Sequence, residues 1–122
     1  MDTRLSSRKK LQQQRAKISF SDQKKVSAFI TEQLIYHPLF LQSQTIASYI
    51  AIQQEIDPSA LVQKAWQNKQ TCYLPLLQKS QLIFCEYQPH TLLKKNHFNI
   101  PEPPFSSNAC IAVGNIDLVL VP

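Results

Sequence analysis

A single carboxylate, Glu55, follows directly after an apolar stretch in the middle of this chain of 122 residues. The sequence around it reads YIAIQQEIDPSALV, from Tyr49 to Val62. An ionised carboxylate presents two acceptor oxygens side by side and can accept two parallel hydrogen bonds. Its position therefore fits the paired N–H and NH2 donors of a 2-amino-4-oxo heterocycle, and a solvated turn residue is the simpler alternative.

Basic residues are concentrated in the first 25 positions, which hold eight Lys and Arg against two Asp, in a chain of net charge +5. On a helix, the three arginines and Leu11 share one stripe about 60° wide. Guanidinium groups bind phosphate oxygens in a bidentate way, so the stripe fits a nucleotide, a nucleic acid or a membrane surface. The alternative is a solvated basic helix that docks through Leu5, Leu11 and Ile18. The arginines of the stripe are Arg4, Arg8 and Arg15.

Two amphipathic helices are predicted after this basic segment. Ser19 followed by Asp22 is typical of a capping box, and apolar residues at helical spacing continue until Pro38 stops the run. A second helix has Pro58 at its first position, directly after Asp57, which can cap it. The residues expected to face the core are Val26, Phe29, Ile30 and Leu34 in the first helix, and Leu61, Val62, Ala65 and Trp66 in the second.

Four strands are predicted, at 45–52, 70–77, 80–87 and 116–122. The first, TIASYIAI, has no charge and is typical of a strand covered on both faces. A short polar connection joins the second to the third and suggests a hairpin-like pair. This alternation predicts α/β layering with a mostly parallel sheet. Ligands gather at the carboxyl ends of strands in such sheets, and Glu55 stands just beyond the end of the first strand.

The cysteines, the histidines and the hydropathy pattern narrow the class of protein. Cys72, Cys85 and Cys110 are widely spaced and form no C-x-x-C pair, so we expect buried reduced thiols and neither a disulfide framework nor a zinc site. The histidines do not have metal-ligand spacing either. No stretch reaches the roughly 18 apolar residues of a membrane span, and the first residues lack the apolar core of a secretory signal. We therefore expect a cytoplasmic protein.

Taken together, several segments resemble the 5-formyltetrahydrofolate cyclo-ligase family, also called 5,10-methenyltetrahydrofolate synthetases. They are the basic N-terminal residues, YIAIQQEIDPSALVQKAWQNKQTCYLPLL, FNIPEPP and IDLVLVP, and they span nearly the whole chain. The resemblance implies a three-layer α/β sandwich of the NagB/RpiA/CoA-transferase-like kind, with a mostly parallel sheet flanked by helices. It also implies ATP-dependent cyclisation of 5-formyltetrahydrofolate to 5,10-methenyltetrahydrofolate, with release of ADP and phosphate and a requirement for Mg²⁺.

The same resemblance assigns roles to four residues. Arg4 and Arg8 match the first and last residues of the family pattern Lys-x-x-Leu-Arg, whose basic residues contact the ATP phosphates, although Ser7 stands where leucine is usual. Ile50 and Glu55 match the apolar and acidic residues that bind the folate substrate. No catalytic residue and no metal ligand are assigned.

One departure from the family pattern concerns glycine. The family continues with a glycine-rich motif that begins at the position of Pro122, and this chain contains one glycine, Gly114. We therefore expect a single domain, residues 1–122, truncated before that motif, monomeric, and weak or inactive alone. The alternatives are a non-catalytic folate- or nucleotide-binding remnant, and a nucleic-acid-binding protein that uses the basic N-terminal helix. We expect small molecules, rather than a membrane or a nucleic acid, as its main partners.

Overall fold

The structure is a computed structural model that describes residues 3–52 and 54–122, apart from the side chains of Arg15 and Ala16. Three helices come first: α1 (Thr3–Ala16), α2 (Phe20–Leu34) and α3 (Pro38–Gln42). The Oγ of Ser19 accepts a hydrogen bond of 3.0 Å from the backbone N–H of Asp22, which confirms the predicted cap of α2. None of the described helices has the length and apolar character needed to cross a membrane.

The remaining chain forms a mixed five-stranded sheet in the order β6-β3-β2-β1-β7. Its strands are β1 (Thr45–Ala47), β2 (Thr71–Gln78), β3 (Gln81–Tyr87), β6 (Cys110–Ile111) and β7 (Leu118–Val119). The interior strand β1 pairs in parallel with both β2 and β7, whereas β2–β3 and β3–β6 are antiparallel. The predicted hairpin of the second and third strands is thus confirmed, and so is the α/β class with a sheet flanked by helices.

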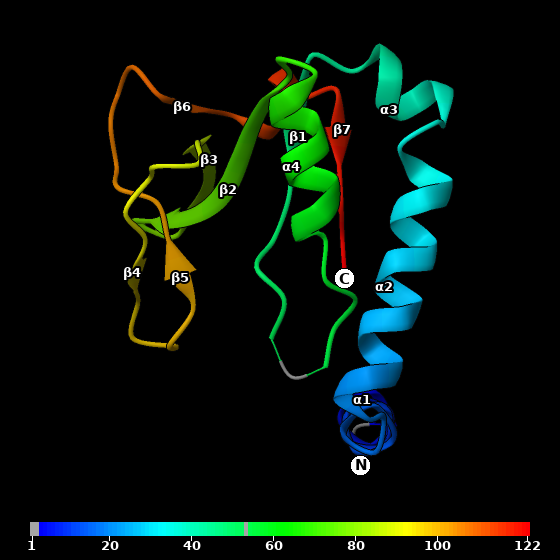
Figure 1. Ribbon diagram of the computed structural model, residues 1–122. Helices are drawn as coiled ribbons and strands as arrows, with labels where there is room; N and C mark the ends of the chain where they lie inside the picture. The colour runs from blue at the N-terminus through cyan, green and yellow to red at the C-terminus, as the bar shows by residue number, and fades with distance from the viewer. Residues whose placement is uncertain (1–2, 53) are drawn as a thin grey trace.

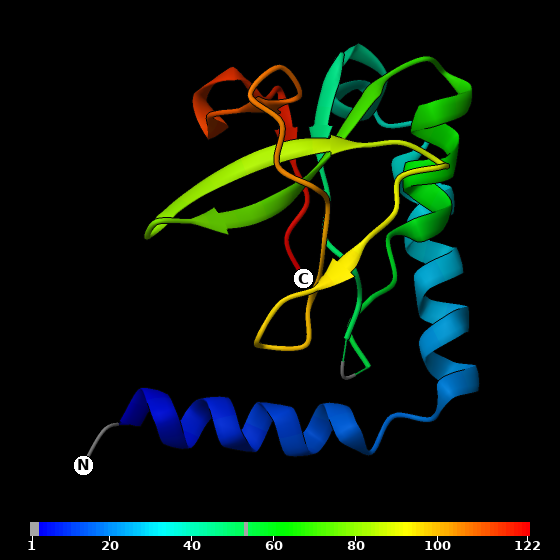
Figure 2. The same cartoon turned by 90° about the vertical axis from the view of Figure 1, so that its left-hand side faces the viewer.

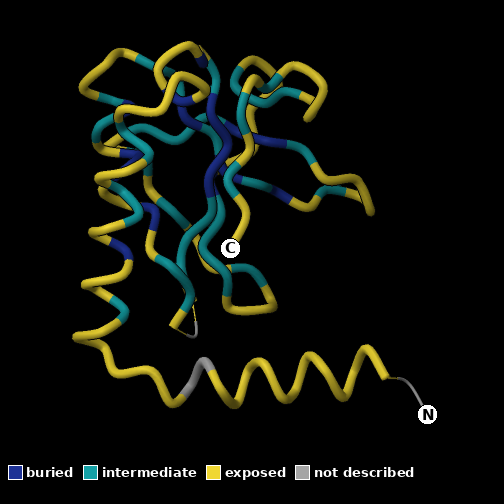
Figure 3. The backbone as a smooth tube through the Cα atoms, turned by 90° about the vertical axis from the view of Figure 1, so that its right-hand side faces the viewer, coloured by how far each residue is buried: buried dark blue, intermediate teal, exposed yellow. Residues whose placement is uncertain are grey.

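Helix α4 (Ser59–Gln67) connects β1 to β2 and contacts β2 as well as α2 (Figure 1). Its apolar stripe follows the prediction: Leu61, Val62 and Ala65 are buried, and Trp66 packs against the core. The core cluster also contains Phe40 from α3. Figure 3 shows most buried residues gathered where the sheet meets the helices, whereas residues 3–14 of α1 are exposed.

The predicted inner face of α2 is partly wrong. Val26 and Phe29 are 45% and 63% exposed, whereas Ile30 and Leu34 are half-buried, as expected. The buried residue of this helix is Ser27. The helix is therefore rotated relative to its apolar pattern, because polar side chains on its inner face contact the backbone of a neighbouring loop, as described below.

The first predicted strand is shorter than expected. Strand β1 ends at Ala47, and the apolar residues up to Ile52 form no strand. The backbone N–H of Ser48 still donates to the carbonyl of Tyr73 in β2, at 2.9 Å, before the chain leaves the sheet. The apolar residues that follow, including Ile50, line a cavity instead of pairing with a neighbouring strand.

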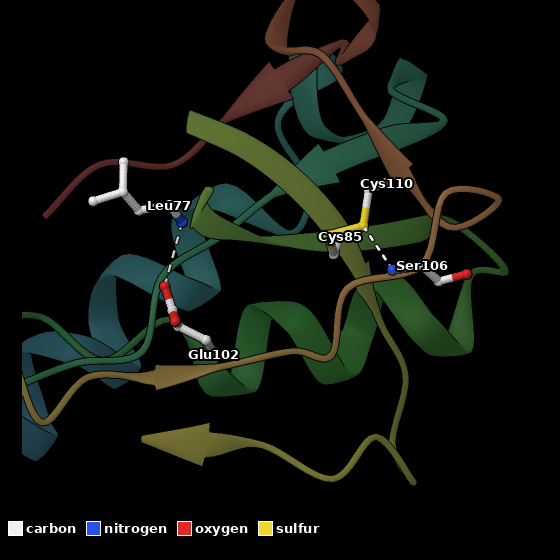
Figure 4. The surroundings of a disulfide bond; sticks show 5 residues. All are labelled: Leu77, Cys85, Glu102, Ser106 and Cys110. Carbon is white, nitrogen blue, oxygen red and sulfur yellow. Dashed lines mark hydrogen bonds between the residues drawn. A yellow bond between two sulfur atoms is a disulfide. The ribbon is translucent and has the colours of Figure 1, made fainter. Parts of the chain in front are cut away.

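Two cysteines form a disulfide, contrary to the expectation of three reduced thiols. Cys85 of β3 and Cys110 of β6 lie opposite each other in the sheet, with 4.0 Å between their Cα atoms (Figure 4). The sequence pattern missed this pair because β6 has only two residues and was not predicted. Cys72 is free and buried, and burial raises the pKa of its thiol to about 12.

A separate two-stranded sheet lies within the segment that the disulfide closes. It consists of β4 (Lys94–Lys95) and β5 (Pro101–Glu102), and β5 includes part of the segment FNIPEPP. Glu102 Oε2 accepts a hydrogen bond of 3.3 Å from the backbone N–H of Leu77, which connects this small sheet to β2 (Figure 4). The proline-rich segment thus packs beside the hairpin.

Candidate functional site

The loop between β1 and α4, residues 48–58, contains both predicted substrate residues. It leaves the carboxyl end of β1 and descends on the side of the body where α1 lies (Figure 2). The phenolic O–H of Tyr49 donates a hydrogen bond of 2.5 Å to the carbonyl of Ile56, so this side chain connects the beginning of the loop to its end. At its end, Asp57 Oδ1 accepts a hydrogen bond of 2.9 Å from the N–H of Ser59, the first residue of α4. The helix therefore begins one residue later than predicted, with Pro58 and not Asp57 at the N-cap position.

Glu55 closes a tight turn at the far end of this loop. Its N–H donates to the carbonyl of Ile52 at 3.0 Å, and its Oε1 accepts from the N–H of Ile52 at 2.9 Å. Gln54, within the turn, has a positive φ of 61°. The carboxylate is therefore held next to its own turn. Burial, followed by the charges of Glu55 and Asp57, raises the pKa of Tyr49.

A cavity of about 250 Å³ opens between this loop, α4 and the end of β3. Its wall includes two aromatic rings, because Trp66 and Tyr87 pack edge to face with centroids 5.1 Å apart. Trp66 Nε1 also donates a hydrogen bond of 2.9 Å to the carbonyl of Tyr87, which fixes the indole. The lining residues are Tyr49, Ile50, Ala51, Asp57, Ser59, Val62, Gln63, Trp66 and Tyr87.

The structure places the two predicted substrate residues differently with respect to this cavity. Ile50 lines it, whereas Glu55 is not among its described lining residues and binds the N–H of Ile52 with its carboxylate. The aromatic pair Trp66 and Tyr87 was missed as a cavity wall. The signal for Trp66 was ambiguous, because a tryptophan on an apolar helix stripe is usually a core residue.

The predicted phosphate-binding arginines lie on α1, away from the cavity wall. Arg4 and Arg8 are exposed, and no described residue of α1 lines the cavity. The third arginine of the stripe, Arg15, has a side chain outside the described part. The alternative of a docked helix is wrong in its contacts, since Leu5, Leu11 and Ile18 are 59%, 63% and 44% exposed.

Two polar residues of α2 hold the loop from outside. Gln23 Nε2 donates a hydrogen bond of 2.6 Å to the carbonyl of Glu55, and the Oγ of Ser27 accepts one of 2.9 Å from the N–H of Asp57. Neither residue was singled out from the sequence. Their signal was a pair of polar residues four positions apart, which share one face of a helix.

Within the described residues there is no group of three or more His, Cys, Asp or Glu side chains that could hold a metal ion. Two of the histidines have local contacts. His37 Nδ1 accepts a hydrogen bond from the N–H of Leu39 at the start of α3, and the ring of His97 packs against Phe98.

Comparison with known proteins places these features in a family. The 5-formyltetrahydrofolate cyclo-ligase of Haemophilus influenzae is 33% identical over 84 residues, covering 66% of this chain and 45% of that protein. The enzyme of the same name from Escherichia coli K12 is 22% identical over 115 residues, covering 92% and 63%. The chain thus spans about half to three fifths of the length of these relatives.

Solved structures and a family model agree with these similarities. The 5,10-methenyltetrahydrofolate synthetase of Aquifex aeolicus has a TM-score of 0.82 at 24% identity, covering 94% of this chain and 58% of that one. The corresponding protein of Mycoplasma pneumoniae has a TM-score of 0.62 at 19% identity, covering 70% and 54%. Both likenesses concern the fold. The model of the 5-formyltetrahydrofolate cyclo-ligase family matches residues 1–122, and the chain therefore belongs to that family.

Proposed function

We propose that residues 1–122 form one α/β domain that binds 5-formyltetrahydrofolate and serves its ATP-dependent cyclisation to 5,10-methenyltetrahydrofolate. The observation that carries this proposal is the aromatic cavity at the carboxyl end of β1, with Ile50 and Asp57 among its lining residues and Glu55 in the same loop. A flat heterocycle fits a wall made of two aromatic rings and aliphatic side chains. Membership in the cyclo-ligase family supports a folate as that heterocycle.

In this proposal Glu55 and Ile50 divide the recognition of the pterin ring. The Glu55 carboxylate accepts hydrogen bonds from the N–H and NH2 edge, and Ile50 contacts the ring face. The carboxylate keeps its bond to the N–H of Ile52 through Oε1. An ionised acceptor that is already held by the backbone loses little freedom when the ligand binds, which favours affinity.

The chemical step requires activation of a poor leaving group. ATP phosphorylates the formyl oxygen and leaves as ADP. N10 of the folate then attacks the formyl carbon and loses its proton to water, and the C–O bond breaks to release phosphate and leave a methenyl carbon joined to N5 and N10. Positive side chains assist by stabilising the transferred phosphoryl group, and we assign this role to Arg4 and Arg8. Arg4 and Arg8 lie on an exposed helix and do not line the cavity. In this proposal the nucleotide therefore contacts both α1 and the residues around the cavity.

Mg²⁺ is expected to accompany the nucleotide. The described residues form no metal-binding cluster, so they do not fit a resident metal. We further propose a cytoplasmic, monomeric protein, and light scattering of the purified chain tests the monomeric state.

Titration of the purified chain with 5-formyltetrahydrofolate tests this proposal. Trp66 is the only tryptophan in the chain and lines the cavity, so binding should quench its fluorescence in a saturable way. Glu55→Gln keeps the size of the side chain and an acceptor for Ile52 but removes the charge. We expect it to weaken binding by about tenfold to a hundredfold, because hydrogen bonds to charged groups are worth about 1.5–3 kcal/mol.

Two controls complete this titration. Free N-acetyltryptophanamide corrects for light absorbed by the folate, and Gln12→Ala on exposed α1 should leave the affinity unchanged. The absence of saturable quenching in the wild-type chain would falsify folate binding. Formation of the 5,10-methenyl product with ATP and Mg²⁺, measured separately, decides between turnover and binding alone.

Binding of nucleic acid by α1 is a second candidate, supported by one observation. All described side chains of this basic helix are exposed, and its first turn contains no acidic residue. Such a helix binds polyanions with an affinity that falls steeply with salt. Titration with an oligonucleotide at two salt concentrations, beside titration with ATP, therefore separates the two roles, and Arg8→Ala should weaken whichever ligand α1 holds.

A further inference from the structure

The inner face of α2 changes its chemistry along the helix. Gln23, Ser27, Ile30 and Leu34 fall within about 60° of one another around the axis. The last two are apolar and line a cavity of about 270 Å³ beside Leu61. The first two are polar and contact the backbone of the loop 48–58 instead.

Side chains hold the backbone of this loop at three successive positions. Gln23 binds the carbonyl of Glu55, Tyr49 binds the carbonyl of Ile56, and Ser27 binds the N–H of Asp57. Residues 55–57 belong to no helix or strand, so these bonds replace the regular pairing that would otherwise order the chain. Two of the three bonds come from α2, which lies more than 20 residues away in the sequence.

The amide of Gln23 is not required for packing alone. An apolar side chain of the same length could fill this position on the helix, but it could not donate to a carbonyl. Ser27 is 7% exposed, and its hydroxyl accepts from a loop N–H that would otherwise lack this bond. A buried polar group that is matched by the backbone of one segment fixes where that segment lies.

We propose that Gln23 and Ser27 are positioning residues that orient the Glu55 carboxylate for the folate ring. This inference rests on the proposed function for the identity of the ligand. Gln23 holds the carbonyl of Glu55, and Ser27 holds the loop two residues later. Together they fix the backbone of residues 55–57, and with it the position from which Glu55 presents its carboxylate.

The test compares Gln23→Met, Ser27→Ala and a control, Gln33→Ala, in the full chain. Met keeps the length of Gln and removes its donors, and Gln33 is an exposed glutamine of the same helix. We expect Gln23→Met and Ser27→Ala each to raise the Kd for 5-formyltetrahydrofolate about fivefold, as for the loss of one hydrogen bond. The Kd for ATP should stay within about twofold, and Gln33→Ala should change neither value.

A double-mutant cycle distinguishes positioning from general stabilisation. In the Glu55→Gln background, Gln23→Met should have little further effect, because the charge that Gln23 orients is absent. Effects that add fully in the double variant would overturn the inference. A wild-type affinity in Gln23→Met would also overturn it, since packing alone would then suffice.

Amide hydrogen exchange provides a readout that does not depend on the ligand. Loss of the bonds from α2 should make the N–H groups of Ile52, Glu55 and Asp57 exchange at least about fivefold faster, while those of β2 are unchanged. If the wild-type chain does not bind folate, the proposed function fails, and exchange alone then decides the inference. Equal exchange rates in Gln23→Met and wild type would refute it.

Discussion

The β2–β3 hairpin and the loop between β1 and α4 order their backbones in opposite ways. The hairpin pairs its strands over seven residue pairs around a two-residue turn, Lys79–Ser80. The loop 48–58 leaves the sheet after Ser48, and side chains from α2 and from the loop itself hold its backbone. The hairpin is therefore expected to supply stability, and the loop to supply recognition that depends on a few individual hydrogen bonds.

The largest expected effect is loss of stability from the hairpin core. Leu74 of β2 is 1% exposed, so Leu74→Ala should lower the free energy of unfolding by about 2–5 kcal/mol, through lost burial and an unfilled cavity. Urea denaturation measures this. Leu77→Ala on the same strand is the control, because Leu77 is 52% exposed and should cost less than about 1 kcal/mol. Equal costs at the two positions would contradict the assignment of stability to the buried face.

Breaking the disulfide should also act on the hairpin side of the molecule. Cys85 and Cys110 are 25 residues apart, and reduction should lower the free energy of unfolding by about 3 kcal/mol, because the unfolded chain regains the entropy of an open loop. Denaturation with and without a reducing agent measures this, and the double substitution to serine repeats it. A thiol reagent added to the folded, unreduced protein provides a control. Cys72 should not react with it, because its thiol is buried and has a pKa of about 12.

The smallest expected effect concerns the loop. Tyr49→Phe removes the hydrogen bond to the carbonyl of Ile56 and should cost about 1 kcal/mol at neutral pH. Burial, then Glu55 and Asp57, raises the pKa of Tyr49, so the folded state favours the neutral phenol. The corresponding stability is fully present below the unfolded pKa of about 10 and is lost as the pH rises through the folded pKa.

Denaturation at pH 8 and at pH 11 checks this dependence. The stability difference between wild type and Tyr49→Phe should shrink at the higher pH, because only the wild-type chain can lose this contribution. Tyr73 and Tyr87 also have raised pKa values, but they are present in both proteins and cancel. A difference that is independent of pH would show that Tyr49 does not control the loop in this way.

Local patterns predicted the hairpin well and the loop poorly, and the reason is physical. The strands of the hairpin lie next to each other in the sequence, so two apolar segments and a short polar connection were enough to identify them. The apolar stretch TIASYIAI was extended as one strand, yet only Thr45–Ala47 pairs. Apolar character alone does not distinguish residues that line a cavity from residues that continue a strand.

The predictions of the inner face of α2 and of reduced cysteines were wrong for a different reason. The hydrophobic pattern places Val26 and Phe29 inward, but Gln23 and Ser27 occupy the inner face because their partners are backbone groups more than 25 residues away. Cys110 lies opposite Cys85 because it belongs to β6, a strand of two residues that pairs with β3. For Glu55 the sequence indicated the correct loop, and its orientation depends on contacts from α2 that no local pattern contains.

In the part of the chain that the structure describes, side chains rather than glycine occupy the left-handed region of the backbone. Among the described residues, five adopt a left-handed backbone conformation and none of them is glycine: Gln54, Lys69, Lys79, Ser80 and Asn99. Side chains with a Cβ atom occupy this conformation at a cost of roughly 1 kcal/mol each. Substitution of such residues by glycine is therefore one way to raise the stability of the folded state. At Lys79–Ser80 the backbone already has the two positive φ angles that favour Asn-Gly, so evolution or design could make the hairpin firmer there without touching the cavity.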